Sequence, residues 1–148
     1  MAITALVAWI LTAGGGFYML AKWIAGGGHR RPGTTKFPPA VVFGHFLLAA
    51  VGLVLWIIYI AADNDPIGWV ALIVLVPVAA LGFTMLTLWI PSYRNSRAPA
   101  TAGAGSGPAS GDAPPERSFP VVVVGAHGVL AVATVILVLL TMLHVGGS

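Results

Sequence analysis

Four long apolar stretches divide the chain, and each is long enough to cross a bilayer as a helix. They are Ala2–Ile24, Pro38–Ala62, Pro66–Ile90 and Phe119–Val145. About 20 residues of helix span the ~30 Å of hydrocarbon in a membrane. The stretches are continuously apolar, whereas the strands of a membrane barrel alternate polar and apolar residues. The pattern therefore predicts an all-α membrane protein, a bundle of four transmembrane helices. The first stretch counts as a helix because it lacks the basic start of a signal peptide.

Composition removes the soluble alternatives. Of the 148 residues, 58% are hydrophobic and 7% are charged, whereas a soluble domain carries roughly a quarter charged residues. We therefore expect the lipid bilayer as a partner, and the net charge of +3 indicates membrane topology, not nucleic-acid binding. The absence of cysteine excludes thiolate zinc sites and iron–sulfur clusters. Four histidines remain as candidate metal ligands.

The basic residues orient the helices. All 7 Lys and Arg lie in or beside the first and third connections, and none lies in the second, at 63–65. The positive-inside rule then places the first and third loops in the cytoplasm and both termini outside, in the inner (plasma) membrane of the cell. Within the third connection, Ala98–Pro115 is rich in Ser, Ala, Gly and Pro, which predicts a flexible cytoplasmic linker over 92–118. Trp23 and Trp89 are expected in the aromatic belt at the membrane interface.

Two pairs of segments repeat along the chain. FPPAVVFGHFLLA at Phe37–Ala49 and FPVVVVGAHGVLA at Phe119–Ala131 agree at seven of thirteen positions. GFYMLAKWI at Gly16–Ile24 and GFTMLTLWI at Gly82–Ile90 agree at six of nine. Both matches occur in the same order, so we interpret the chain as a two-helix hairpin duplicated in tandem. The first hairpin repeat is 1–62 and the second, which contains the linker, is 66–145.

The repeat aligns two histidines, His45 and His127. Each lies seven residues after the proline that begins its apolar stretch, about 10 Å along a helix. Parallel repeats have a pseudo-twofold axis along the membrane normal, so both histidines are expected at one depth, in the cytoplasmic half, facing each other. Two opposed neutral imidazoles are the axial ligands of a six-coordinate b-type haem. His144 aligns with Ala62 and has no partner, which predicts one haem b, with His45 and His127 as metal ligands.

Small and aromatic residues surround the predicted haem. Phe17 and Phe83, each preceded by a glycine, are expected to wall its two open sides, and small residues on the face of each histidine leave room for the ring. Each imidazole is expected to donate its other ring proton to a carbonyl one turn earlier, that of Val41 or Val123. The predicted cofactor-binding residues besides the histidines are Gly16, Phe17, Ala49, Gly52, Gly82, Phe83, Ala131 and Thr134, with Arg30, Arg31 and Lys36 for the propionates.

A four-helix membrane bundle with histidines on its second and fourth helices, flanked by small residues, resembles the haem-binding core of small b-type membrane cytochromes. The FP…H…LA pattern is also similar to that of small actinobacterial four-helix membrane proteins. The resemblance implies electron transfer through a bis-histidine haem, with quinone or a larger respiratory or redox complex as the partner.

Other functions remain open. The histidines could hold another metal or a chlorin-type pigment, or they could only pack in a cofactor-free membrane scaffold or assembly subunit. Half of a transporter or channel is less compatible, because the spans hold no ionisable residue other than His, Tyr and the boundary Lys22. A stand-alone enzyme is not expected, since the four carboxylates lie in loops and no hydrolase or phosphate-binding motif occurs.

Overall fold

The computed structural model describes residues 1–30, 33, 35–97 and 114–145 of the chain. Their long helices are α1 (Ala2–Ala25), α2 (Pro39–Ala62), α3 (Asp65–Arg97) and α4 (Val121–Met142), and a short 3-10 helix, η1 (Pro115–Ser118), precedes α4. Each long helix is long and apolar enough to cross a membrane, and the described residues contain no strand. The prediction of an all-α protein with four potential membrane-spanning helices is therefore confirmed.

Prolines and one tight turn set the ends of the helices. Pro38 and Pro120 directly precede α2 and α4 with φ of -60° and -65°. Proline suits this place because its φ is fixed near that value and its missing N–H would have no partner in the first turn. At the other end of the bundle, Asp63 takes a left-handed φ of 48° and turns the chain from α2 towards α3. Asp65 then begins α3, where a carboxylate meets the positive end of the helix dipole.

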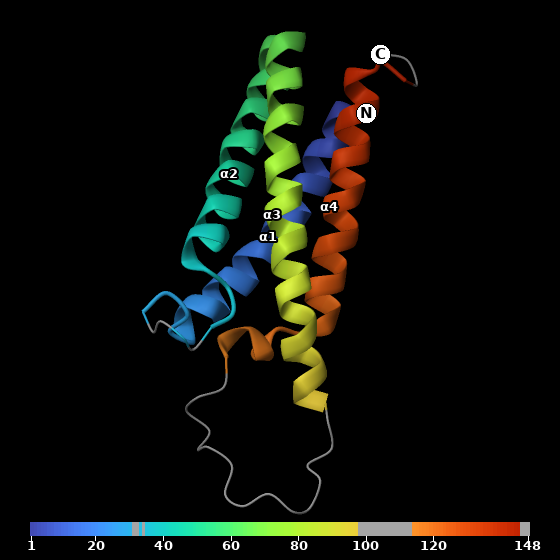
Figure 1. Ribbon diagram of the computed structural model, residues 1–148. Coiled ribbons are helices and arrows are strands. Elements are labelled where there is room, and N and C mark those ends of the chain that lie inside the picture. Colours follow the sequence, from blue (N-terminus) through green and yellow to red (C-terminus); the bar gives the residue numbers. More distant parts are fainter. Residues whose placement is uncertain (31–32, 34, 98–113, 146–148) are drawn as a thin grey trace, which may run out of the picture.

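The helices run alternately up and down, so the start of α1, the α2–α3 turn and the end of α4 share one end of the bundle (Figure 1). The connections that carry the basic residues lie at the opposite end, which we call the basic end. α2 packs mainly against α3 and α1 mainly against α4, whereas α1–α2 and α3–α4 touch only sparsely. The bundle thus consists of two tight helix pairs, α2–α3 and α1–α4.

Helix α3 continues to Arg97, past the predicted end at Ile90 and into the predicted linker. Pro91 lies inside the helix, where it removes one backbone hydrogen bond. The ring of Trp89 stacks on that of Tyr93 with centroids 4.9 Å apart, and this contact bridges the proline. Residues 98–113 of the linker lie outside the described residues, but the described η1 packs against α1 and α3.

Trp23 and Trp89 are buried at the basic end, so their rings pack inside the protein and do not face lipid as the residues of an aromatic belt do. Trp23 Nε1 donates to Thr35 Oγ1 over 3.0 Å. Trp89 Nε1 donates to the backbone carbonyl of Glu116 over 3.1 Å. A buried indole N–H needs an acceptor, and the two loops at this end supply one to each. The two tryptophans therefore fill the interior of the basic end and bind the loops there through their indole N–H groups.

Candidate cofactor site

His45 and His127 face each other across the boundary between the two helix pairs. Their ring centroids are 6.3 Å apart and their planes are inclined by 59°. His45 lies on α2 and His127 on α4, so each tight pair contributes one ring. Both side chains are partly buried. The structure thus brings together the two residues that the repeat aligns.

A backbone carbonyl of the neighbouring helix holds each imidazole. His45 Nδ1 lies 2.9 Å from the carbonyl oxygen of Val78 in α3, and His127 Nδ1 lies 2.9 Å from that of Thr12 in α1. A carbonyl oxygen only accepts hydrogen bonds, so Nδ1 carries the proton in both neutral rings and Nε2 keeps its lone pair. Each bond also joins the two helices of one tight pair.

The predicted bonds to Val41 and Val123, on the same helix as each ring, are therefore wrong. Side chains project sideways from a helix, whereas its carbonyls run along the axis and bond within it. The ring consequently reaches the helix packed beside it. Neither Nε2 atom has a hydrogen-bond partner among the described residues. Both Nε2 lone pairs are available to a ligand.

Gly82 and Gly16 give the two rings access to these carbonyls. A Cβ at Gly82 would lie 3.1 Å from Cε1 of His45, and a Cβ at Gly16 would lie 3.2 Å from Cε1 of His127. Both distances are shorter than an ordinary carbon–carbon contact. Each glycine stands one turn beyond the carbonyl that the ring binds, so carbonyl and glycine together form a notch for the imidazole. The sequence predicted both glycines as site residues but not this contact.

The buried core is interrupted at the level of the histidines. One buried cluster lies towards the α2–α3 turn and includes Trp9, Trp56 and Val138. The other lies towards the basic end and includes Trp23 and Phe37. No residue belongs to both clusters, and the partly buried histidines and their notch glycines stand between them. The site is therefore a layer of imidazoles and small residues between two layers of large apolar side chains.

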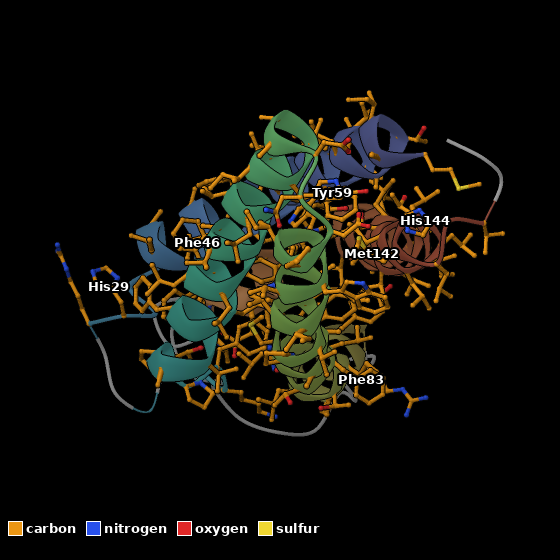
Figure 2. All side chains as sticks on the ribbon, turned by 90° about the horizontal axis from the view of Figure 1, so that it is seen from above. His29, Phe46, Tyr59, Phe83, Met142 and His144 are labelled. Carbon is orange, nitrogen blue, oxygen red and sulfur yellow. The ribbon has the colours of Figure 1, made fainter. Side chains whose placement is uncertain are left out.

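Phe17 and Phe83 follow the two notch glycines but have different surroundings. The Phe17 ring packs edge-on against Phe46 of α2 with centroids 5.3 Å apart. Phe83 is 67% exposed and projects from the periphery of the bundle (Figure 2). Phe17 is itself 56% exposed, so the difference between the two residues is the ring contact of Phe17 with Phe46, which partly covers the side between α1 and α2.

The other small residues predicted at the site lie towards the α2–α3 turn from the histidines. Ala49 is partly buried beside the cluster on that side. Gly52 gives room to an indole, because a Cβ there would lie 3.0 Å from Cζ2 of Trp9. Thr134 is buried and its hydroxyl donates to the carbonyl one turn earlier over 2.8 Å, and Ala131 is partly buried. Gly52 therefore serves the packing of α1 on α2.

The basic residues predicted for propionates belong to the loop between α1 and α2. Arg30 and Lys36 are exposed there, and Arg31 lies outside the described residues. Lys22, near the end of α1, reaches the backbone carbonyl of Ser118 over 3.4 Å. The buried aromatic cluster of the basic end lies between this loop and the histidines.

Glu116 is a completely buried carboxylate, although it lies in the segment predicted as a flexible linker. Its Oε2 accepts a hydrogen bond from Thr35 Oγ1 over 2.8 Å, and its Oε1 accepts one from the backbone N–H of Lys36 over 2.6 Å. These bonds tie the two loops of the basic end together. The available signal was its place three residues before the second Phe-Pro, close to that of Thr35, which lies two residues before the first.

Among the described residues, no group of three or more His, Cys, Asp or Glu is arranged to hold a metal ion. The chain matches no protein-family model, no curated protein and no solved structure. Two imidazoles with free Nε2 atoms in an apolar layer suit a ligand that brings further donor atoms of its own.

Proposed function

We propose that this protein is a b-type membrane cytochrome that holds one haem b between His45 and His127. The observation that carries the proposal is the separation of 6.3 Å between the ring centroids. Metal–imidazole bonds are about 2 Å long, so two rings that point at one metal from opposite sides have centroids about 6 Å apart. The separation is the one that His45 and His127 would have if they held one iron between them.

The hydrogen bonds of the two rings also fit axial ligation. A metal-binding histidine usually donates its other ring N–H to a carbonyl or carboxylate, which fixes the tautomer and the ring orientation. The carbonyls of Val78 and Thr12 have this role for His45 and His127. A haem brings four nitrogen donors, so two protein ligands complete its coordination. When bound, it supplies one-electron redox chemistry, and bis-histidine ligation favours electron transfer over oxygen chemistry.

The boundary between the helix pairs is the place for the porphyrin. Two cavities of about 340 and 480 Å³ lie beside the loop after α1, and neither is lined by His45 or His127. Binding a ring of porphyrin size therefore requires the side chains between the pairs to rearrange. The sparse contacts of α1–α2 and α3–α4 favour this movement.

Contacts between aligned residues support a tandem duplication as the origin of the site. In the repeat alignment Thr12 corresponds to Val78 and His127 to His45. The bond from His127 to Thr12 is therefore the counterpart of the bond from His45 to Val78. Each histidine binds a helix of the other repeat, so a single hairpin cannot hold its own ring in this way.

The charge distribution supports an inner-membrane protein with both termini outside. The described residues at the basic end include Lys22, Arg30 and Lys36, and the opposite end carries Asp63 and Asp65. The positive-inside rule places the basic end in the cytoplasm. In this orientation the haem lies in the cytoplasmic half of the bilayer, and quinone or a larger redox complex is the electron partner.

Four histidine variants test the proposal. Full-length protein produced with added haem is purified in detergent, and the haem content per chain is measured from the Soret band. His45→Ala and His127→Ala should each lose most of the haem, because one axial ligand disappears. His29→Ala and His144→Ala, which change histidines outside the pair, should keep it. Equal haem contents in all four variants would refute the assignment of the ligands.

A cofactor-free scaffold is the second candidate, and the bonds from the two rings to Val78 and Thr12 favour it, because they join helices without any ligand. In that case the wild-type protein has no Soret band. His45→Ala then lowers the thermal stability of a colourless protein, because the bond between α2 and α3 is lost.

A further inference from the structure

The two sides of the histidine pair that face the bilayer are closed differently. Between α1 and α2, the rings of Phe17 and Phe46 meet edge-on at 5.3 Å. Between α3 and α4, the repeat alignment puts Phe83 in the place of Phe17 and Gly128 in the place of Phe46. A Cβ at Gly128 would meet nothing within 4 Å. Phe83 is 67% exposed and Phe17 56%, so the two sides differ mainly in the ring contact that Phe17 makes with Phe46. The contact that closes the first side therefore has no counterpart on the second.

Figure 2 places Phe46 and Phe83 on opposite sides of the bundle. The α1–α2 side is thus the closed side, and the α3–α4 side beside Gly128 is the open side. In a bilayer both sides would face lipid, because the long helices are apolar enough to cross a membrane.

The two ends of the site are blocked by buried side chains. At the basic end the rings of Phe37 and Phe119 lie 6.1 Å apart, and η1 packs across α1 and α3. Towards the α2–α3 turn, Trp9 and Trp56 belong to the buried cluster at that end of the bundle. A large flat molecule cannot reach the histidines through either layer without unpacking it, which leaves the two lipid-facing sides.

We propose that the haem held by the two histidines passes between the lipid and its site through the open side of the bundle, beside Gly128. This inference rests on the proposed function. Haem is a flat, largely apolar molecule that dissolves in membranes. At the open side it needs only to part the sparse contacts of α3 with α4, whereas at the closed side it must also separate the Phe17–Phe46 pair. The route lies beside the haem-binding site and does not include the two histidines. A substitution on the route can therefore change the rates of haem uptake and release without changing the affinity for haem.

Transfer of haem between vesicles tests the route. Full-length haem-free protein in phospholipid vesicles is mixed with vesicles that carry haem, and the rise of the Soret band gives the rate of uptake. Release is followed by transfer to an excess of apomyoglobin. Gly128→Phe restores on the open side the residue present on the closed side, so uptake and release should both slow several-fold and by the same factor. The control is Val129→Phe, at the next residue of α4, which is 71% exposed and should keep wild-type rates.

Phe46→Gly is the complementary variant, because it removes the aromatic pair that blocks the closed side. It should raise both rates, and it tests the route independently if Gly128→Phe does not fold. The inference is overturned if Gly128→Phe transfers haem at the wild-type rate, if Val129→Phe is equally slow, or if Phe46→Gly is slower than wild type. A wild-type protein that takes up no haem refutes the proposed function instead, so the two failures can be told apart.

Discussion

Replacing Glu116 by alanine should destabilise the protein strongly, although the residue lies outside the membrane spans. Its carboxylate is completely buried and accepts hydrogen bonds from Thr35 Oγ1 and from the backbone N–H of Lys36. A buried donor left without an acceptor costs about 1–3 kcal/mol. Two such donors give about 2–6 kcal/mol, and we expect about 3 kcal/mol because water can enter at the loop end and satisfy part of the loss.

The free energy of unfolding can be measured by titrating the detergent-solubilised protein with SDS and following tryptophan fluorescence. Glu116→Gln keeps one acceptor oxygen but turns an amide N–H₂ towards the second donor, so it should lose about 1–2 kcal/mol. The matched control is Asp63→Asn, which removes an exposed carboxylate and keeps a residue type that tolerates its left-handed φ of 48°. It should stay within about 0.5 kcal/mol of wild type. If Glu116→Ala unfolds at the same SDS fraction as Asp63→Asn, the bonds of Glu116 do not stabilise the basic end.

Two further predictions concern the notch and the basic end. Gly82→Ala should weaken haem binding several-fold in a titration with haem, because the new Cβ would lie 3.1 Å from Cε1 of His45; Gly14→Ala has open space and should bind as wild type, and equal affinities would argue against the notch. Trp89→Phe should cost about 1–2 kcal/mol of stability in the same SDS titration, because a buried carbonyl loses its indole donor. Trp69→Phe, at a position 41% exposed, should have little effect, and a similar loss in both variants would contradict the assigned hydrogen bond.

The four helices and the close approach of His45 and His127 could be predicted from the sequence, because local residue patterns and the internal repeat indicate them. Apolar length marks each span, and Pro38 and Pro120 mark the starts of α2 and α4. The repeat places His45 and His127 at one depth, and an up-and-down bundle then turns them towards each other. These signals need no knowledge of which helices pack tightly.

The acceptors of the two rings could not be predicted, because they depend on that packing. Val78 and Thr12 act through backbone carbonyls, which every residue has, so nothing in the side-chain pattern marks them. The pairing of α2 with α3 and of α1 with α4 decides which carbonyl each ring meets.

The burial of Trp23, Trp89 and Glu116 at the basic end could not be predicted from the sequence either. Trp23 and Trp89 have the position typical of an aromatic belt, and only their long-range acceptors, Thr35 and the Glu116 carbonyl, draw them inwards. Glu116 itself follows a long polar stretch, where a carboxylate is normally solvated. The bond between Thr35 and Glu116 joins two distant loops, and a single sequence gives no direct sign of such contacts.

The reduced-minus-oxidised visible spectrum of the purified full-length protein, produced with added haem, tests the central claim most directly. We expect a Soret band and a sharp α-band of six-coordinate haem b, with one haem per chain on quantification. A protein that is folded and monodisperse in detergent but shows no Soret absorption would contradict it.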